Sequence, residues 1–200
     1  MRSMLAGLVV LGLAFFSLPA DAGSIQAPYG LNVFGGLATP TGTLAEFSNH
    51  GFSIGGSFTY QTSRLMALEI GAATGQRFSF DEAALGVPAG LVSGANVNVF
   101  SLTGGIRIGN SEAKVAPYGV VGAGLYRVGL SDTEITIPGL GTQTITGVSE
   151  NAFGMNFGGG VQSQMSPSTS VFGEVRYHAA FTSGEATTYL PFNGGIRFQW

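Results

Sequence analysis

The sequence predicts an all-β fold, an eight-stranded antiparallel up-and-down barrel that crosses a membrane. Three observations predict it. Apolar and polar residues alternate in eight separate segments, the connections between those segments are alternately long and short, and only 10% of the 200 residues are charged. Alternation with a period of two indicates a strand with two unlike faces. Short connections on one rim and longer ones on the other are typical of transmembrane barrels.

The composition excludes several other classes of protein. The net charge is −3 and the eight basic residues are scattered, so the chain lacks the clustered Lys and Arg that nucleic-acid binding requires. The absence of cysteine excludes disulfides, thiolate metal sites and cysteine nucleophiles. Fifteen Phe and six Tyr can bury ample surface, which argues against disorder. We expect no cofactor and no metal.

The first 22 residues have the pattern of a secretory signal peptide. Arg2 precedes an apolar run from Met4 to Leu18, and Ala20 and Ala22 stand at the two positions where a signal peptidase requires small residues. The run is about 15 residues long, whereas a membrane-spanning helix needs roughly 20. We therefore predict cleavage of residues 1–22, export through the inner membrane, and a single mature domain of residues 23–200.

The alternating segments define the strands and their connections. We predict strands over residues 29–39, 52–62, 65–75, 97–108, 115–128, 152–163, 168–181 and 188–200. Short turns at Ser63-Arg64, at GNSEAK and at QMSPS lie on one rim, and the four longer connections lie on the other. Strands of this length, tilted by about 40°, stand roughly 28 to 35 Å tall, enough to cross a bilayer.

Residue identity indicates which face of each strand points inward. In the last strand, Phe192, Ile196 and Phe198 share one face, and Asn193 and Arg197 share the other. The charged strand residues all fall on the polar face by our assignment: Glu69, Arg107, Arg127, Glu174, Arg176 and Arg197. The chain has one lysine, which argues against this face being the solvated exterior of a soluble secreted barrel, the alternative with the same periodicity and the fourth in order. The polar face therefore lines the lumen, which in an eight-stranded barrel is filled by side chains.

Aromatic residues on the apolar face indicate two interfacial girdles. Tyr118 and Tyr126 are eight residues apart in one strand, about 20 Å along the membrane normal after tilt. We assign both to the outer face, one to each girdle. The remaining candidates are Tyr29, Tyr60 and Trp200 near the rim of short turns and Phe181 near the opposite rim.

Three segments resemble a known family. APYGVVGAGLYRV, GGGVQSQMSPSTSVFGEVRY and the closing GGIRFQW are similar to the outer-membrane beta-barrel domain family of Gram-negative bacteria, which includes small eight-stranded OmpA-like and opacity-type surface barrels. The resemblance covers essentially the whole mature chain and implies an outer-membrane location. It also implies that Phe198 and Trp200 form the terminal signal read by the outer-membrane assembly machinery, with periplasmic chaperones as earlier partners. Phe is commoner than Trp at that last position.

The inward charges are expected to form a lumen network that includes His178. Buried charges persist only when paired, and folding the last two strands about their loop predicts contact between Glu174 and Arg197. Four arginines against two glutamates leave two positive charges for water, a loop carboxylate such as Asp132, or an anion to balance. The network is either a salt-bridged plug, which the narrow bore favours, or an anion-conducting gate.

Catalysis is not expected. His178 with Ser183 and Glu185 suggests a nucleophilic triad like that of outer-membrane lipid A deacylases. In that family the serine follows the histidine by two residues, where this chain has Ala180, and the catalytic groups face lipid, whereas His178 points inward by parity. The sequence therefore predicts a protein that is not an enzyme.

The long connections are the candidate recognition elements. Residues 130–151 alternate and turn at Pro138-Gly139, which predicts a hairpin extending two strands beyond the membrane. Residues 76–96 contain apolar side chains that either cap the barrel mouth or enclose a small hydrophobic ligand: Phe78, Phe80, Leu85, Val87 and Leu91.

The predicted function is structural or adhesive, exerted through these loops. The alternatives are a narrow channel or carrier for small apolar molecules and, third, a lipid A-modifying enzyme. We expect a monomer in contact with outer-membrane lipids and lipopolysaccharide.

Overall fold

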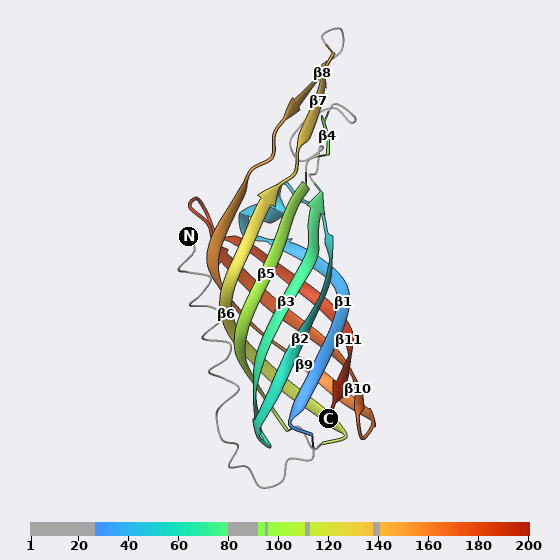
Figure 1. Cartoon of the computed structure of the whole chain (residues 1–200). Helices are drawn as coiled ribbons and strands as arrows, with labels where there is room; N and C mark the ends of the chain where they lie inside the picture. Colours follow the sequence, from blue (N-terminus) through green and yellow to red (C-terminus); the bar gives the residue numbers. More distant parts are fainter. Residues whose placement is uncertain (1–26, 80–91, 95, 111–112, 138–140) are drawn as a thin grey trace.

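A computed structural model describes residues 27–79, 92–94, 96–110, 113–137 and 141–200 of the chain. Eight strands close into a barrel in the order β1-β11-β10-β9-β6-β5-β3-β2, and all neighbours are antiparallel (Figure 1). Their bounds are β1 Tyr29–Thr41, β2 Gly51–Ser63, β3 Met66–Ser79, β5 Asn96–Gly109, β6 Val115–Leu130, β9 Ser149–Ser166, β10 Thr169–Phe181 and β11 Thr187–Gln199. The predicted fold class and all eight strands are confirmed. The predicted signal peptide, residues 1–22, lies outside the described residues.

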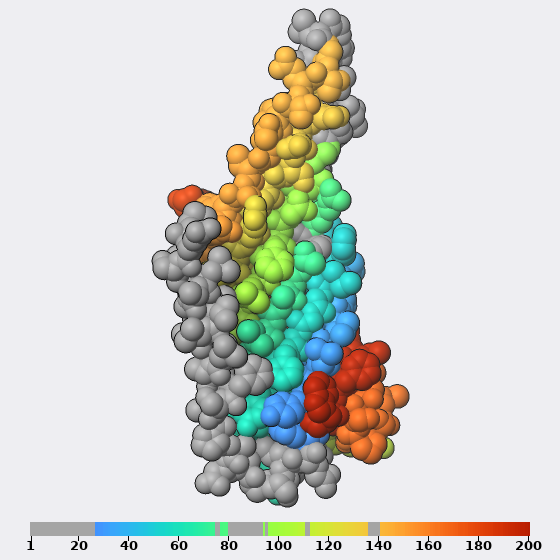
Figure 2. Space-filling model, in the orientation of Figure 1, coloured from blue at the N-terminus to red at the C-terminus, as the bar shows by residue number. Residues whose placement is uncertain are grey.

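The first and last strands close the barrel. The backbone N–H of Tyr29 donates to the carbonyl of Trp200, and the N–H of Trp200 donates back to Tyr29, both at 3.1 Å. The pairing continues upward through Leu31 opposite Phe198. In Figure 2 the C-terminal residues (red) accordingly lie against the first strand (blue). Closure leaves no barrel strand with an unpaired edge.

The two rims differ as the sequence predicts. The connections β2–β3, β5–β6 and β9–β10 are short and lie on the rim that also carries the C-terminus, which we call the turn rim (Figure 1). The opposite loop rim carries the longer connections, including a 3₁₀-helix η2 at Gly42–Glu46. Within the described ranges, no helix is long and apolar enough to cross a membrane.

A small sheet rises above the loop rim (Figure 1). The hairpin predicted within residues 130–151 is present as β7 (Thr133–Ile137) paired with β8 (Gly141–Ile145), and its predicted turn at Pro138-Gly139 lies outside the described residues. A two-residue strand, β4 (Val92–Ser93), pairs with β7 and completes the order β4-β7-β8. Neither β4 nor η2 was predicted.

The outer face of the barrel is apolar on every strand. Exposed side chains include Leu37 at 65%, Phe157 at 59% and Ile108 at 56%. A water-soluble protein rarely exposes so continuous an apolar surface. The outer face therefore suits a hydrocarbon environment.

Aromatic rings gather on this face at the turn rim. Tyr29 lies 5.5 Å from Tyr60, 5.9 Å from Phe58 and 6.4 Å from Trp200, measured between ring centroids. Tyr29, Tyr60 and Trp200 are the predicted aromatic group near the short turns, and Phe58 lies beside them. At the other end Phe181 is 51% exposed, as a girdle residue would be.

Glycines let large rings lie flat inside the narrow bore. A Cβ on Gly160 would lie 2.6 Å from the hydroxyl oxygen of Tyr118, and one on Gly154 would lie 2.6 Å from the ring of Tyr126. Real Cβ atoms do not approach other atoms so closely, so each tyrosine occupies space that a side chain would take. The glycine content of the chain thus follows in part from aromatic packing in an eight-stranded lumen.

Candidate functional site

The middle of the lumen is held by one arginine and two glutamates. Arg176 and Glu174 lie two residues apart on the inward face of β10, and Glu69 lies on β3. Arg176 donates from Nε and Nη2 to the two oxygens of Glu174, both at 2.9 Å, and from Nη2 to Glu69 Oε1 at 2.9 Å. Because β3 and β10 are four strands apart in either direction round the barrel, this contact joins opposite walls.

A second polar layer lies nearer the turn rim. Arg107 donates from Nη2 to Gln162 Oε1 at 2.8 Å, and its guanidinium carbon lies 3.4 Å from the ring centroid of Tyr118. Arg197 is 4% exposed, and its Nε has no hydrogen-bond partner among the described residues. This layer therefore contains two buried guanidinium groups.

The predicted contact between Glu174 and Arg197 is wrong. In the β10–β11 register, Glu174 is opposite Asn193, and Arg197 is opposite Ser170, four residues nearer the turn rim. The Glu174 carboxylate is instead hydrogen-bonded by Arg176, which lies on the same face of β10. The predicted register between β10 and β11 is therefore displaced by four residues from the one observed.

The predicted faces of β6 are also wrong. Tyr118 and Tyr126 are 7% and 1% exposed and point into the lumen, so neither belongs to an outer girdle. Arg127 consequently points outward, where it is exposed and donates to Ser149 Oγ at 3.1 Å, so it is not part of the lumen network. Glycine, alanine and valine occur on both faces of this strand, so alternation separates two sets of residues without showing which is inside.

The two tyrosines point inward because their polar partners lie there. Tyr118 lies under the Arg107 guanidinium, and the Tyr126 hydroxyl lies 2.9 Å from His178 Nδ1. Gln162 and Asn156, also absent from the predicted network, complete it from β9. Asn156 and Gln162 lie on the same face of β9, because both occupy even positions. Two large amides on one face of a glycine-rich strand are the feature of the sequence that could have identified them as lumen residues.

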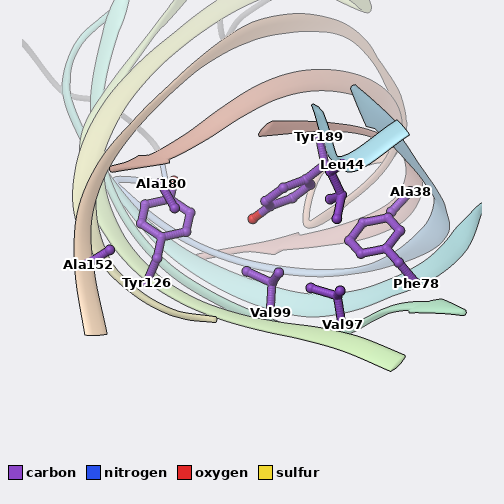
Figure 3. Packing of buried hydrophobic residues seen from close by; sticks show 9 residues of the cluster. All are labelled: Ala38, Leu44, Phe78, Val97, Val99, Tyr126, Ala152, Ala180 and Tyr189. Carbon is purple, nitrogen blue, oxygen red and sulfur yellow. The ribbon is translucent and has the colours of Figure 1, made fainter. Parts of the chain in front are cut away.

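An apolar layer fills the lumen at the loop rim (Figure 3). Tyr189 is fully buried, stacks on His178 at a centroid distance of 4.8 Å, and lies 5.9 Å from Phe78. Figure 3 shows the layer, which consists of Ala38, Leu44, Phe78, Val97, Val99, Tyr126, Ala152, Ala180 and Tyr189. Phe78 thus packs in the barrel mouth. The other apolar residues of that connection, Phe80, Leu85, Val87 and Leu91, lie outside the described residues.

The cavities left between these side chains are small. One beside Glu69 and Glu174 and one beside Arg107 and Arg197 each have a volume of about 20 Å³, and a third near Asn156 has about 10 Å³. A single water needs roughly 10 to 15 Å³ measured in this way. Each cavity therefore holds about one water.

The three residues that suggested a catalytic triad are not assembled into one. The His178 ring contacts Tyr126 and Tyr189 inside the barrel. The Ser183 hydroxyl instead bonds Glu150 Oε2 at 3.0 Å, and the Glu185 carboxylate accepts a hydrogen bond from Thr43. This arrangement provides no histidine to activate Ser183.

Known structures share this architecture. Neisserial surface protein A has a TM-score of 0.60 at 15% identity, with 87% of this chain and 98% of that chain covered. A major outer membrane protein from Thermus thermophilus has a TM-score of 0.54 at 14% identity, covering 86% and 99%. Outer membrane protein OprG from Pseudomonas aeruginosa has a TM-score of 0.51 at 14% identity, covering 88% and 99%. These likenesses concern the fold.

No curated protein sequence matches the chain. The family model described as "Outer membrane protein beta-barrel domain", however, matches residues 8–197, nearly the whole length. The apolar exterior and the closed eight-stranded barrel agree with that match. The chain therefore belongs to the outer membrane protein beta-barrel domain family.

Proposed function

We propose that this protein is a structural, surface-presenting barrel of the outer membrane whose filled lumen anchors the loop-rim elements for adhesion or for envelope integrity. The observation that carries the proposal is the filling of the bore by three successive layers. Arg107 and Arg197 lie nearest the turn rim, the Arg176 cluster lies in the middle, and the apolar layer lies at the loop rim. Between them the described cavities hold about one water each.

The sheet β4-β7-β8 supports a role at the cell surface. It stands beyond the barrel mouth, and the side chains of β8 are exposed along its whole length. A barrel braced across its bore gives such a sheet a rigid base. The proposal assigns no catalytic role, in keeping with the separation of His178 from Ser183.

The proposal includes a route and a set of partners. The mature chain is exported after loss of residues 1–22, and the assembly machinery, helped by periplasmic chaperones, recognises the strand that ends at Trp200. Lipids and lipopolysaccharide contact the exposed apolar face, and the barrel is a monomer. The 57% exposure of Trp200, with its neighbour Tyr29 on the same outer face, supports the terminal signal.

Recording in planar bilayers tests the filled lumen. The purified protein should give no stable conductance steps, and the same should hold for Arg127→Met, which changes an arginine outside the bore. Regular steps from the unaltered protein would contradict the plug. Steps that appear only in Arg176→Met would favour the anion-conducting gate, because that substitution removes the contact between opposite walls.

Complementation tests the surface role. A strain lacking the gene should regain resistance to detergent with EDTA, or adherence to a surface, when it carries the unaltered gene. A variant in which residues 133–145 are replaced by a short turn should still insert, shown by heat-modifiable gel migration, but should not restore the property. Full restoration by that variant would contradict a role for the β7–β8 hairpin.

The second candidate function, a carrier for small apolar molecules, is favoured by one observation. Phe78, Val97 and Val99 give the barrel mouth an apolar lining. The charged layers below it oppose passage through the bore, because an apolar solute would have to displace paired charges. Proteoliposomes containing a carrier should take up a small apolar dye, whereas those containing a structural barrel should not. Dye uptake therefore distinguishes the two functions.

A further inference from the structure

Two arginines near the turn rim have no acidic partner among the described residues. Arg107 on β5 is 6% exposed and Arg197 on β11 is 4% exposed. Arg176 takes both inward carboxylates, Glu69 and Glu174. Within the described part of the chain, the lumen ion pairs are those of Arg176, and neither Arg107 nor Arg197 belongs to one. Neither arginine thus has an ion-pair partner among the described residues, and because the Arg176 cluster holds one cation and two carboxylates, the three arginines and two glutamates together leave one positive charge uncompensated.

The donors of these arginines are only partly used. Arg107 bonds Gln162 and rests on the Tyr118 ring, which are neutral partners. The buried Nε of Arg197 and the buried hydroxyl of Tyr118 have no hydrogen-bond partner among the described residues. A buried charge or polar group without a partner is costly, so this arrangement is suited to a negative ligand.

The two guanidinium groups line the same cavity. Its volume is about 20 Å³, Tyr118 and Gln162 also line it, and it extends to Asn110 at the end of β5 on the turn rim. The cavity takes one water-sized particle. A monatomic halide fits that size, whereas phosphate or sulfate would require the lining side chains to move.

We propose that Arg107 and Arg197 together bind a chloride ion at the turn-rim end of the lumen. The ion offsets the one uncompensated positive charge of the lumen network and accepts hydrogen bonds from the two guanidinium groups, whose planar donors suit anions. The site takes a small inorganic anion from the solution on that side. The site lies at the opposite end of the barrel from the β4-β7-β8 sheet. A negative result for chloride binding would therefore leave the proposed surface role untouched.

Urea unfolding of the refolded protein in detergent micelles measures the binding. A ligand that binds only the folded state raises stability as its concentration exceeds the dissociation constant. With ionic strength held constant by sodium gluconate, the unfolding midpoint should rise with chloride concentration. Because sulfate stabilises folded proteins generally, its effect is compared between the unaltered protein and Arg197→Met, and it should be the same in both. A midpoint independent of chloride, or a sulfate effect that Arg197→Met abolishes, would overturn the proposal.

Variants assign the effect to the site. Arg197→Met should weaken the apparent chloride affinity at least tenfold, whereas Arg127→Met, an exposed arginine outside the lumen, should leave it unchanged. An equal rise of the unfolding midpoint with chloride in the unaltered protein, Arg197→Met and Arg127→Met would overturn the assignment. If Arg197→Met does not refold, crystals of the unaltered protein soaked in bromide decide. An anomalous peak between the Arg107 and Arg197 guanidinium groups supports the site, and its absence there refutes it.

Discussion

Replacing Arg176 with methionine should strongly destabilise the barrel. The change removes a guanidinium that makes three hydrogen bonds to two carboxylates, whose side chains are only 7% and 6% exposed. Removing one partner of a buried ion pair costs about 3 to 5 kcal/mol. Two carboxylates lose their partner here, but Arg176 itself is 14% exposed and some water reaches it, so we expect about 4 kcal/mol.

The loss can be measured by urea unfolding in detergent micelles. With a slope of about 2 kcal/mol per molar urea, the midpoint should fall by roughly 2 M. The triple variant Arg176→Met, Glu69→Gln, Glu174→Gln removes all three charges, so it should recover at least half of the loss. Arg127→Met, which loses one exposed hydrogen bond, should change stability by less than about 0.5 kcal/mol. A loss below about 1 kcal/mol for Arg176→Met, or a triple variant no more stable than the single one, would refute the reasoning.

Three further predictions concern packing, assembly and processing. Gly160→Ala should cost about 1 to 3 kcal/mol in the same assay, because the new methyl group meets the backbone carbonyl oxygen of Gly173 and the Tyr118 hydroxyl. Gly173→Ala, which places a methyl group in open space, should be neutral. Trp200→Ser should reduce the yield of heat-modifiable barrel in the outer membrane, while Trp200→Phe should not, and normal yield for the serine variant would exclude a terminal signal. Terminal sequencing of the outer-membrane form should begin at or near Gly23, and an intact first methionine would show that residues 1–22 are retained.

The sequence was sufficient to predict the strands because alternation in a membrane barrel is enforced on both faces. Lipid excludes charge from one face and the narrow bore excludes bulk from the other. The strands therefore begin and end close to their predicted positions, and the largest differences are extensions, of β3 at the loop rim and of β9 at both ends. The added part of β3 includes the exposed Arg77, where the apolar alternation weakens.

The lumen contacts were harder to predict because they depend on register and on distance across the bore. The alternation of inward and outward positions correctly places six titratable residues inside the barrel. They are Glu69, Arg107, Glu174, Arg176, His178 and Arg197. Parity does not say that Arg176 reaches Glu69, since the two strands share no edge and the contact spans 107 positions. The orientation of β6 failed for a related reason, because Tyr118 and Tyr126 suit either an interface or a polar lumen.

The link between Arg176 and Glu69 also bears on the order of events in folding. Neighbouring strands such as β10 and β11 can pair as local hairpins, but β3 and β10 approach each other only when the sheet has rolled up and its ends have met. We therefore expect the ion pair to form late, after the transition state in which most strand pairing is established. Its removal should accelerate unfolding while leaving the folding rate nearly unchanged, so this cluster sets how long a finished barrel lasts rather than how quickly one is made.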